Sequence, residues 1–142
     1  MHQRVFLTPL LLLCACGSKW GTELQRDMHY GSATIFHSEA VDAATASKVF
    51  AALTDAQYNF ASNLPEQVDR VNGRTTLRLC NDNEDSIAAI VAAGEKEPAI
   101  RYFEGLAYEV SKVLGGEPVD IVLCRKSLDE PFFTVVWKET PK

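Results

Sequence analysis

Short apolar runs separated by polar, glycine-containing or proline-containing segments predict five strands after residue 30. In the first run Ile35 and His37 share one face, and Phe36 points to the other. The pair Asn72-Gly73 lies between the second and third runs, where it strongly favours a hairpin with a type I′ turn. The segment "RKSLDE" joins the last two runs and predicts a second hairpin. The predicted strands are residues 32–41, 67–71, 75–80, 117–124 and 131–137.

A period of three to four residues predicts two amphipathic helices. The first covers residues 42–60, with Asp42 as its N-cap. The second covers residues 98–114, with Pro98 in its first turn and Gly115-Gly116 after its end. Their apolar positions are Ala46, Val49, Phe50 and Leu53 in the first helix, and Ile100, Phe103, Leu106 or Ala107, Val110, and Val113 or Leu114 in the second.

The order of these elements is β-α-β-β-α-β-β, and each helix is apolar on one side only. This order predicts an α+β fold, with a mostly antiparallel sheet of four to five strands and two helices on one face. A ferredoxin-like strand order is its specific form. The insertion at 81–97 has two interpretations: a short helix at 85–93 that Gly94 ends, or a mobile excursion.

The N-terminus carries the apolar run "VFLTPLLLLCAC" behind a single arginine, Arg4. A membrane-spanning helix needs roughly 20 apolar residues, so this run is too short, and Pro9 disfavours a helix within it. A charged start, a short apolar stretch and small residues after it are typical of a secretory signal peptide. We therefore expect residues 1–15 to be removed.

The sequence Leu13-Cys14-Ala15-Cys16, followed by Gly17, resembles the lipobox of bacterial lipoproteins. The resemblance implies a lipid on Cys16 of the mature protein, with Cys14 as the alternative. The resemblance also implies that the mature N-terminus carries several acyl chains, which are enough for stable anchoring in a membrane. Gly17-Ser18 lacks the aspartate that retains some lipoproteins at the inner membrane, so the outer membrane, facing the periplasm, is the expected location.

Signal-peptide removal takes away Arg4, so 13 of the 14 basic residues remain against 19 acidic ones, and the net charge falls from −5 to −6. This balance argues against a nucleic-acid partner, which needs a clustered basic face. Residues 16–29 are expected to be the lipidated cysteine and a tether. Residues 30–142 are expected to form one domain, since the mature length supports one core and not two.

The segments "SEAVDAATASKVF" and "FEGLAYEVSKVLGGEPVDIVLC" are similar to a small α+β domain of uncharacterised bacterial proteins. There a helix ends in glycine and precedes a strand of the form Pro-Val-x-Ile/Val-x-Leu-Cys. The resemblance covers residues 31–137, and the insertion at 81–97 departs from it. It implies a fold and no activity.

Few residues indicate chemistry. The sequence contains no C-x-x-C, H-E-x-x-H, G-x-S-x-G, P-loop or G-x-G-x-x-G motif, so we expect no metal site and no cofactor. Asp82, Glu84 and Asp85 lack the glycine of a calcium-binding EF-hand loop. A nucleophilic Cys80 or Cys124 with His37 as base would make a small envelope hydrolase, the alternative function.

Cys80 and Cys124 each end a predicted strand, and both are expected on the sheet face opposite the helices. In a ferredoxin-like order the strand at 32–38 lies between them, and two strand spacings give roughly 9–10 Å. A disulfide requires Cα atoms within about 7 Å. The predicted order therefore favours two free thiols, whereas direct neighbours at about 4.8 Å would permit the bond.

The last predicted strand is apolar on both faces, with Phe132 and Val136 on one and Phe133, Val135 and Trp137 on the other. A sheet covered on one side should alternate with polar residues. Either a partner or the chain's own segments cover the second face. With the lipobox, this predicts a lipid-anchored binding module with a protein partner in the envelope, such as an inhibitor or immunity-type lipoprotein. Its candidate binding residues are Phe132, Phe133, Val135 and Trp137.

Overall fold

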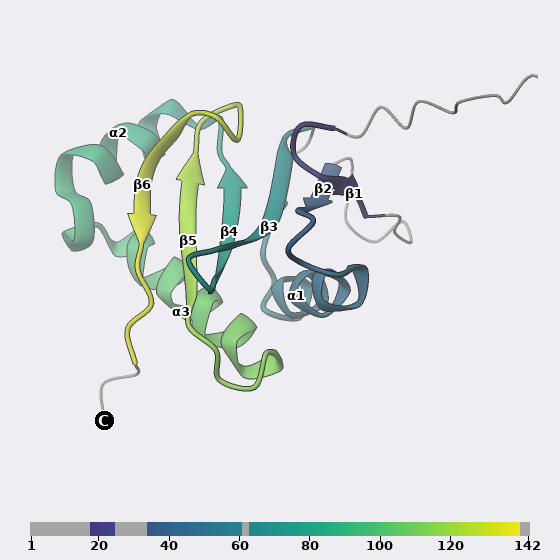
Figure 1. Ribbon diagram of the computed structural model, residues 1–142. Helices are drawn as coiled ribbons and strands as arrows, with labels where there is room; N and C mark the ends of the chain where they lie inside the picture. The colour runs from purple at the N-terminus through teal and green to yellow at the C-terminus, as the bar shows by residue number, and fades with distance from the viewer. Residues whose placement is uncertain (1–17, 25–33, 61–62, 140–142) are drawn as a thin grey trace, which may run out of the picture.

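The computed structural model describes residues 18–24, 34–60 and 63–139, in which one mixed sheet is covered by helices on one side (Figure 1). The predicted signal peptide and Cys16 lie outside these residues. The strands are β1 (Thr22–Glu23), β2 (Thr34–His37), β3 (Pro65–Val71), β4 (Arg74–Cys80), β5 (Val119–Cys124) and β6 (Pro131–Val135). The helices are α1 (Ala43–Asp55), α2 (Glu84–Ala93), the short 3₁₀ helix η2 (Gly94–Lys96) and α3 (Pro98–Val113).

The α+β class is confirmed, but the sheet differs from the predicted one. It has six strands in the order β1-β2-β3-β4-β5-β6, not four to five. Two of its neighbouring pairs, β2 with β3 and β4 with β5, are parallel, so the sheet is mixed rather than mostly antiparallel. The additional strand is β1, which lies in the predicted tether and pairs with β2.

The ferredoxin-like order is wrong, because each helical crossover joins strands that are direct neighbours. The crossover from β2 to β3 and the crossover from β4 to β5 both move one strand in the same direction across the sheet. Because β3 and β4 are antiparallel, the first crossover joins strands that run opposite to those joined by the second. Their helices share one core on one face. One crossover is therefore left-handed, which is the rare hand.

Local signals in the sequence explain the turns and helix ends. Asn72 and Gly73 have φ of 52° and 76°, which confirms the type I′ hairpin between β3 and β4. Asp42 caps α1 through the amide of Thr45, as predicted. The helix ends at Asp55 rather than near residue 60, and Gln57 follows in a left-handed conformation, φ 60°. In the insertion, the helical interpretation is confirmed by α2.

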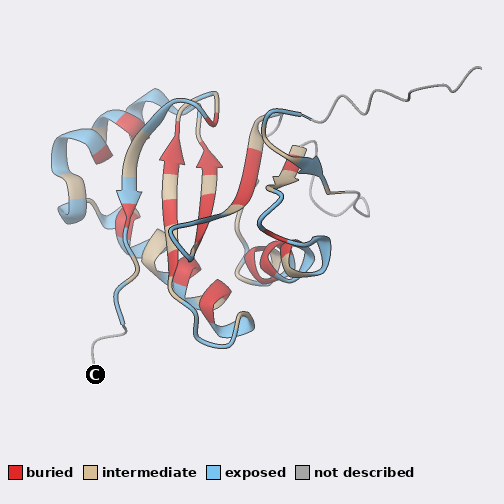
Figure 2. Ribbon diagram, viewed as in Figure 1, coloured by how far each residue is buried: buried red, intermediate tan, exposed pale blue. Residues whose placement is uncertain are grey.

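The main core lies between the sheet and the helices, where alternate strand residues are buried (Figure 2). Leu77 and Leu79 of β4 are in register with Ile121 and Leu123 of β5 and face this core. The helices contribute their predicted apolar stripes. The largest buried side chains of the whole core, from strands and helices together, include Ile35, Phe50, Leu53, Leu77, Leu79, Ile100, Ile121 and Leu123.

A second, smaller cluster lies on the opposite face of the sheet. Cys80, Cys124 and Leu128 are buried there, and Trp20 from the N-terminal segment packs against them. Gly21 permits this close approach: its φ is 104°, and a Cβ there would lie 2.1 Å from the carbonyl oxygen of His37. Residues 18–24 are therefore held against the sheet.

Candidate functional site

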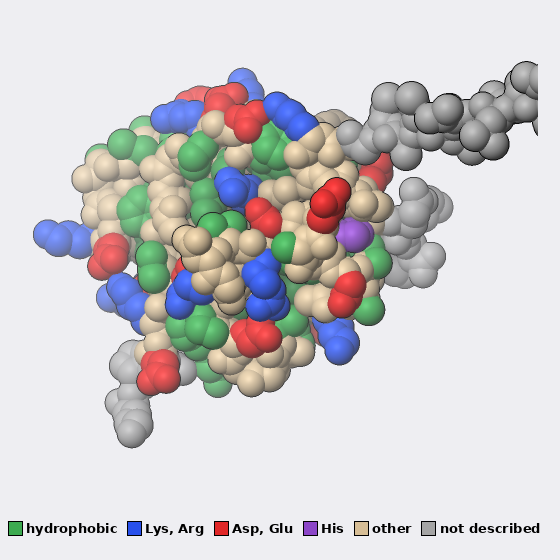
Figure 3. Space-filling view, viewed as in Figure 1, with side chains coloured by type: hydrophobic (Ala, Val, Ile, Leu, Met, Phe, Trp, Pro, Cys, Tyr) green, Lys and Arg blue, Asp and Glu red, His purple; other side chains and the backbone are tan. Residues whose placement is uncertain are grey.

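The sheet face opposite the helices, called the open face below, carries mostly polar side chains. One register row crosses all six strands, and the next row brings together Asp69, Thr76 and Asp120. Polar residues on this face alternate along the strands with apolar residues on the helix side, which is typical of a sheet with one face exposed to solvent. Figure 3 shows charged groups interspersed with apolar ones on the visible surface. The six-strand row consists of Glu23, Phe36, Gln67, Arg78, Val122 and Thr134.

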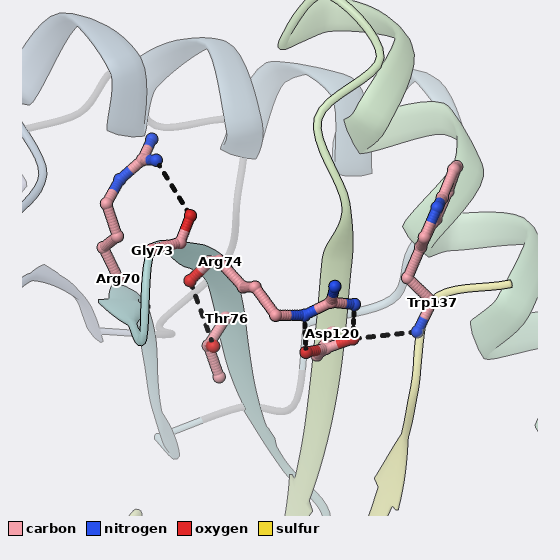
Figure 4. Close-up of polar contacts among 6 residues, drawn as sticks. All are labelled: Arg70, Gly73, Arg74, Thr76, Asp120 and Trp137. Atoms are coloured by element: carbon pink, nitrogen blue, oxygen red, sulfur yellow. Dashed lines mark hydrogen bonds and ion pairs between the residues drawn. The ribbon is translucent and has the colours of Figure 1, made fainter. Parts of the chain in front are cut away.

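Asp120 joins three segments on this face (Figure 4). Its carboxylate accepts two hydrogen bonds from the Arg74 guanidinium, at 2.7 and 2.8 Å, and one from the backbone N–H of Trp137 at 2.8 Å. The hydrogen bonds from Arg74 hold the pKa of Asp120 below its ordinary value, and the Trp137 amide adds to this effect. This contact fixes the chain where it leaves β6.

The four predicted binding residues lie around β6 but in different environments. Val135 is only 4% exposed and belongs to the main core. Phe133 also faces the helices, and a Cβ placed on Gly94 would lie 3.8 Å from its ring. Phe132 is half-buried, with the Arg125 guanidinium 5.7 Å from its ring centroid. The helices thus account for one apolar face of this strand.

The outer edge of β6 is the clearest exposed feature. The strand pairs with β5 on one side, and no described strand pairs with its other side. An edge strand of this kind carries unpaired backbone N–H and C=O groups. Thr134 is exposed, and Val136 just beyond the strand is 54% exposed. Backbone donors, backbone acceptors and apolar side chains therefore occur together along this edge.

A cleft of about 440 Å³ lies at the end of β6, between its trailing segment and α3. The rings of Trp137 and Tyr108 are stacked there, with centroids 6.5 Å apart and planes at 6°. The Lys138 ammonium lies 3.4 Å from Glu95 and 3.6 Å from Glu104, which holds the segment against the helices. The cleft has an aromatic wall and a charged rim.

The two cysteines lie side by side, and both are buried free thiols in the structure, as predicted, although the strand order behind that prediction is wrong. Cys80 and Cys124 are register partners on the neighbouring strands β4 and β5. The Cys124 thiol also donates to the carbonyl oxygen of Leu128 at 3.7 Å. A hydrogen bond between the two thiols raises the pKa of Cys80, and burial raises it further. The same hydrogen bond lowers the pKa of Cys124.

His37 does not join the cysteines. It has the same orientation along β2 as Ile35, which faces the main core, whereas the cysteines face the other side. Its Nδ1 lies 2.7 Å from the carbonyl oxygen of Val41. The predicted Cys–His pair is therefore not assembled, and no geometry here supports the hydrolase alternative.

The acidic cluster at residues 82–85 has a local role. The Asn83 side chain caps α2 by accepting from the amide of Ser86, and Glu84 lies 3.3 Å from Arg125. Asp85 lies in the first turn, where a negative charge is favourable. Within the described ranges no three histidine, cysteine or acidic side chains are grouped to hold a metal ion.

Sequence reasoning missed one buried polar pair. Glu66 of β3 is fully buried, and its carboxylate accepts a hydrogen bond from the Tyr58 hydroxyl at 2.7 Å. Burial raises the pKa of Tyr58 well above its ordinary value, and the charge of Glu66 raises it further. The pair ties the loop after α1 to the sheet. The predicted strand began at residue 67, whereas β3 begins at Pro65, so Glu66 fell outside the prediction and gave no signal.

Comparison with protein-family models, with curated proteins and with solved structures finds no match. In the part of the chain that the structure describes, every helix is too short or too polar to cross a membrane.

Proposed function

We propose that this protein is a lipid-anchored binding module of the bacterial cell envelope that holds an extended segment of a partner protein along β6. The observation that carries the proposal is the unpaired outer edge of β6. Extended peptides add to exposed sheet edges through main-chain hydrogen bonds, and alternate side chains supply specificity. The edge and its side chains form one continuous strip at residues 132–138.

Side chains next to the edge provide selectivity. Phe132, Thr134 and Val136 follow one another at alternate positions, the spacing at which a bound strand presents its own side chains. The cleft beside Trp137 accepts a large apolar side chain at the end of such a segment.

The proposed anchor orients the molecule. Only Gly17 separates Cys16 from Ser18, the first described residue, and β1 follows at Thr22–Glu23. The edge strand β1 is thus close to the lipid in the sequence. Since β6 forms the opposite edge of the six-stranded sheet, it is directed away from the anchor. An inhibitor or immunity-type lipoprotein that masks an envelope enzyme is the specific form we favour.

Lysine substitutions at the edge test this proposal. We expect Phe132→Lys and Thr134→Lys to reduce recovery of the partner with the tagged lipoprotein at least ten-fold, because lysine at an edge opposes strand addition. The matched control is Val91→Lys, since Val91 is 57% exposed and lies on the helix α2 rather than on β6. Circular dichroism checks the fold of each variant. Equal recovery with all three variants would contradict the proposal.

A further inference from the structure

Cys80 and Cys124 are placed for a covalent bond by the strand order. They are Cα partners in the register of the parallel neighbours β4 and β5. Neighbouring strands lie about 4.8 Å apart, and disulfides join Cα atoms at about 4.4–6.8 Å. Both residues project from the same face of the sheet into one cluster.

The two thiols lie in a buried and mostly apolar environment. Both are almost fully buried, at 2% and 0% exposure. Their neighbours in the cluster are apolar: Leu128 and the half-buried Trp20, Phe36, Leu64 and Val122. No described histidine or carboxylate joins the pair in a metal-binding group.

We propose that Cys80 and Cys124 form an intramolecular disulfide in the exported protein. The proposal rests on the envelope location proposed above, because disulfides persist in oxidising compartments. The oxidant is a disulfide donor, either a thiol oxidoreductase or a small-molecule disulfide.

The exchange has two steps. The Cys124 thiolate attacks a donor sulfur, which forms a mixed disulfide and releases one donor thiolate. The Cys80 thiolate then attacks the Cys124 sulfur and releases the second donor thiol. Two electrons and two protons pass to the donor, whose disulfide is reduced to two thiols. Because Trp20 packs over the cluster, the exchange takes place before residues 18–24 dock.

The bond would close a span of 44 residues that contains α2 and α3. These helices cover the inner face of β6, so a cross-link that constrains the span also stabilises the packing beneath the proposed binding edge. Trp20 then shields the bond from external thiols. The bond would be a stable structural element of the mature protein and not a reversible switch.

Peptide mapping tests the bond. Full-length protein is extracted from cells with an alkylating reagent present from lysis, denatured and digested with trypsin without reduction. We expect the peptides covering residues 79–96 and 113–125 to be linked, and to separate after reduction. Alkylated Cys80 and Cys124 in separate peptides would contradict either the disulfide or the proposed location, and the refolding experiment below decides which.

A refolding experiment separates this proposal from the proposed location. Leaderless protein, which begins at residue 16, is refolded with Cys16 replaced by serine in a glutathione redox buffer. We expect the same linked peptides and a melting temperature roughly 10 °C higher than that of the Cys80→Ser/Cys124→Ser control. Linkage here without linkage in cells would overturn only the location. Absence of linkage here would overturn the disulfide itself.

Discussion

Asp120 is the residue on which the geometry of the open face depends most. It receives three hydrogen bonds from groups that lie 46 and 17 positions away in the sequence. These contacts connect β4, β5 and the segment that follows β6. They hold Trp137 in place, and with it the cleft beside the proposed binding edge.

We predict that Asp120→Asn lowers the free energy of unfolding by about 1 kcal/mol at pH 7, since the bonds to Arg74 are charge-assisted but partly solvent-screened. The pKa of Asp120 is depressed in the folded protein. Its contribution is therefore complete above its unfolded pKa and is lost as the pH falls through the folded pKa. The free energies of unfolding of the variant and the wild type should therefore converge as the pH falls. Denaturant unfolding from pH 7 to pH 3 measures this.

The control for this substitution is Asp69→Asn, in the same register row of the open face. Asp69 accepts a hydrogen bond only from the neighbouring amide of Arg70 in its own strand, at 2.7 Å. We expect a smaller change for it. A difference between wild type and Asp120→Asn that does not shrink in acid would contradict the assigned role of the carboxylate.

The residue patterns predicted well which side chains are buried. They did not predict which side chains contact one another in the fold. The apolar stripes of both helices and the facing of Leu77 and Leu79 follow from periodicity alone. The pairing of Trp20 with the cysteine cluster does not, because residues 18–24 show no period and their position depends on Gly21 and on β2. The Asp120 contacts were missed for the same reason: they join positions that only the tertiary fold brings together.

At the scale of elements, α2 and η2 explain why the face of β6 that carries Phe133 is apolar. The sequence left the insertion at 81–97 open between a helix and a mobile excursion. The structure shows a helix whose start is capped by Asn83, and η2 continues it so that Gly94 lies against Phe133. The insertion therefore covers the helix side of the last strand and leaves its outer edge unpaired.

We predict that Asn83→Ala destabilises the protein by about 1 kcal/mol, because the first turn of α2 loses its side-chain acceptor. Hydrogen exchange should increase mainly in α2 and on the inner side of β6. The matched control is Asp82→Ala at the exposed position just before it, for which we expect a change within about 0.5 kcal/mol. Equal effects of the two substitutions would show that Asn83 does not act as a cap.

At the scale of the whole molecule, the sequence predicted the layers but not the strand order. The prediction took a ferredoxin-like order from the succession β-α-β-β-α-β, and two parallel crossovers of the same hand on one face lead to that order. Here one crossover is left-handed, so the strands follow in chain order. No local residue signal encodes this choice. Its consequence is large, because it places Cys80 beside Cys124 and leaves β6 at an edge.

The proposed anchor makes a separate prediction. Cells grown with an alkyne fatty acid should label the wild type and Cys14→Ser, but not Cys16→Ser, because the lipobox resemblance places the lipid on Cys16. Labelled protein is detected after purification by click chemistry. Labelling of Cys16→Ser, together with its loss in Cys14→Ser, would instead assign the lipid to Cys14.

Site-specific photocross-linking in living cells tests the central claim, binding along β6, most directly. A photoreactive phenylalanine is placed in turn at positions 132, 134 and 136, and at control positions 91 and 113 on the helices, both exposed. We predict that the three edge positions cross-link one envelope protein at residues that advance two at a time, as an extended strand requires. Adducts only from the helix positions, or only with a second copy of this chain, would contradict the account.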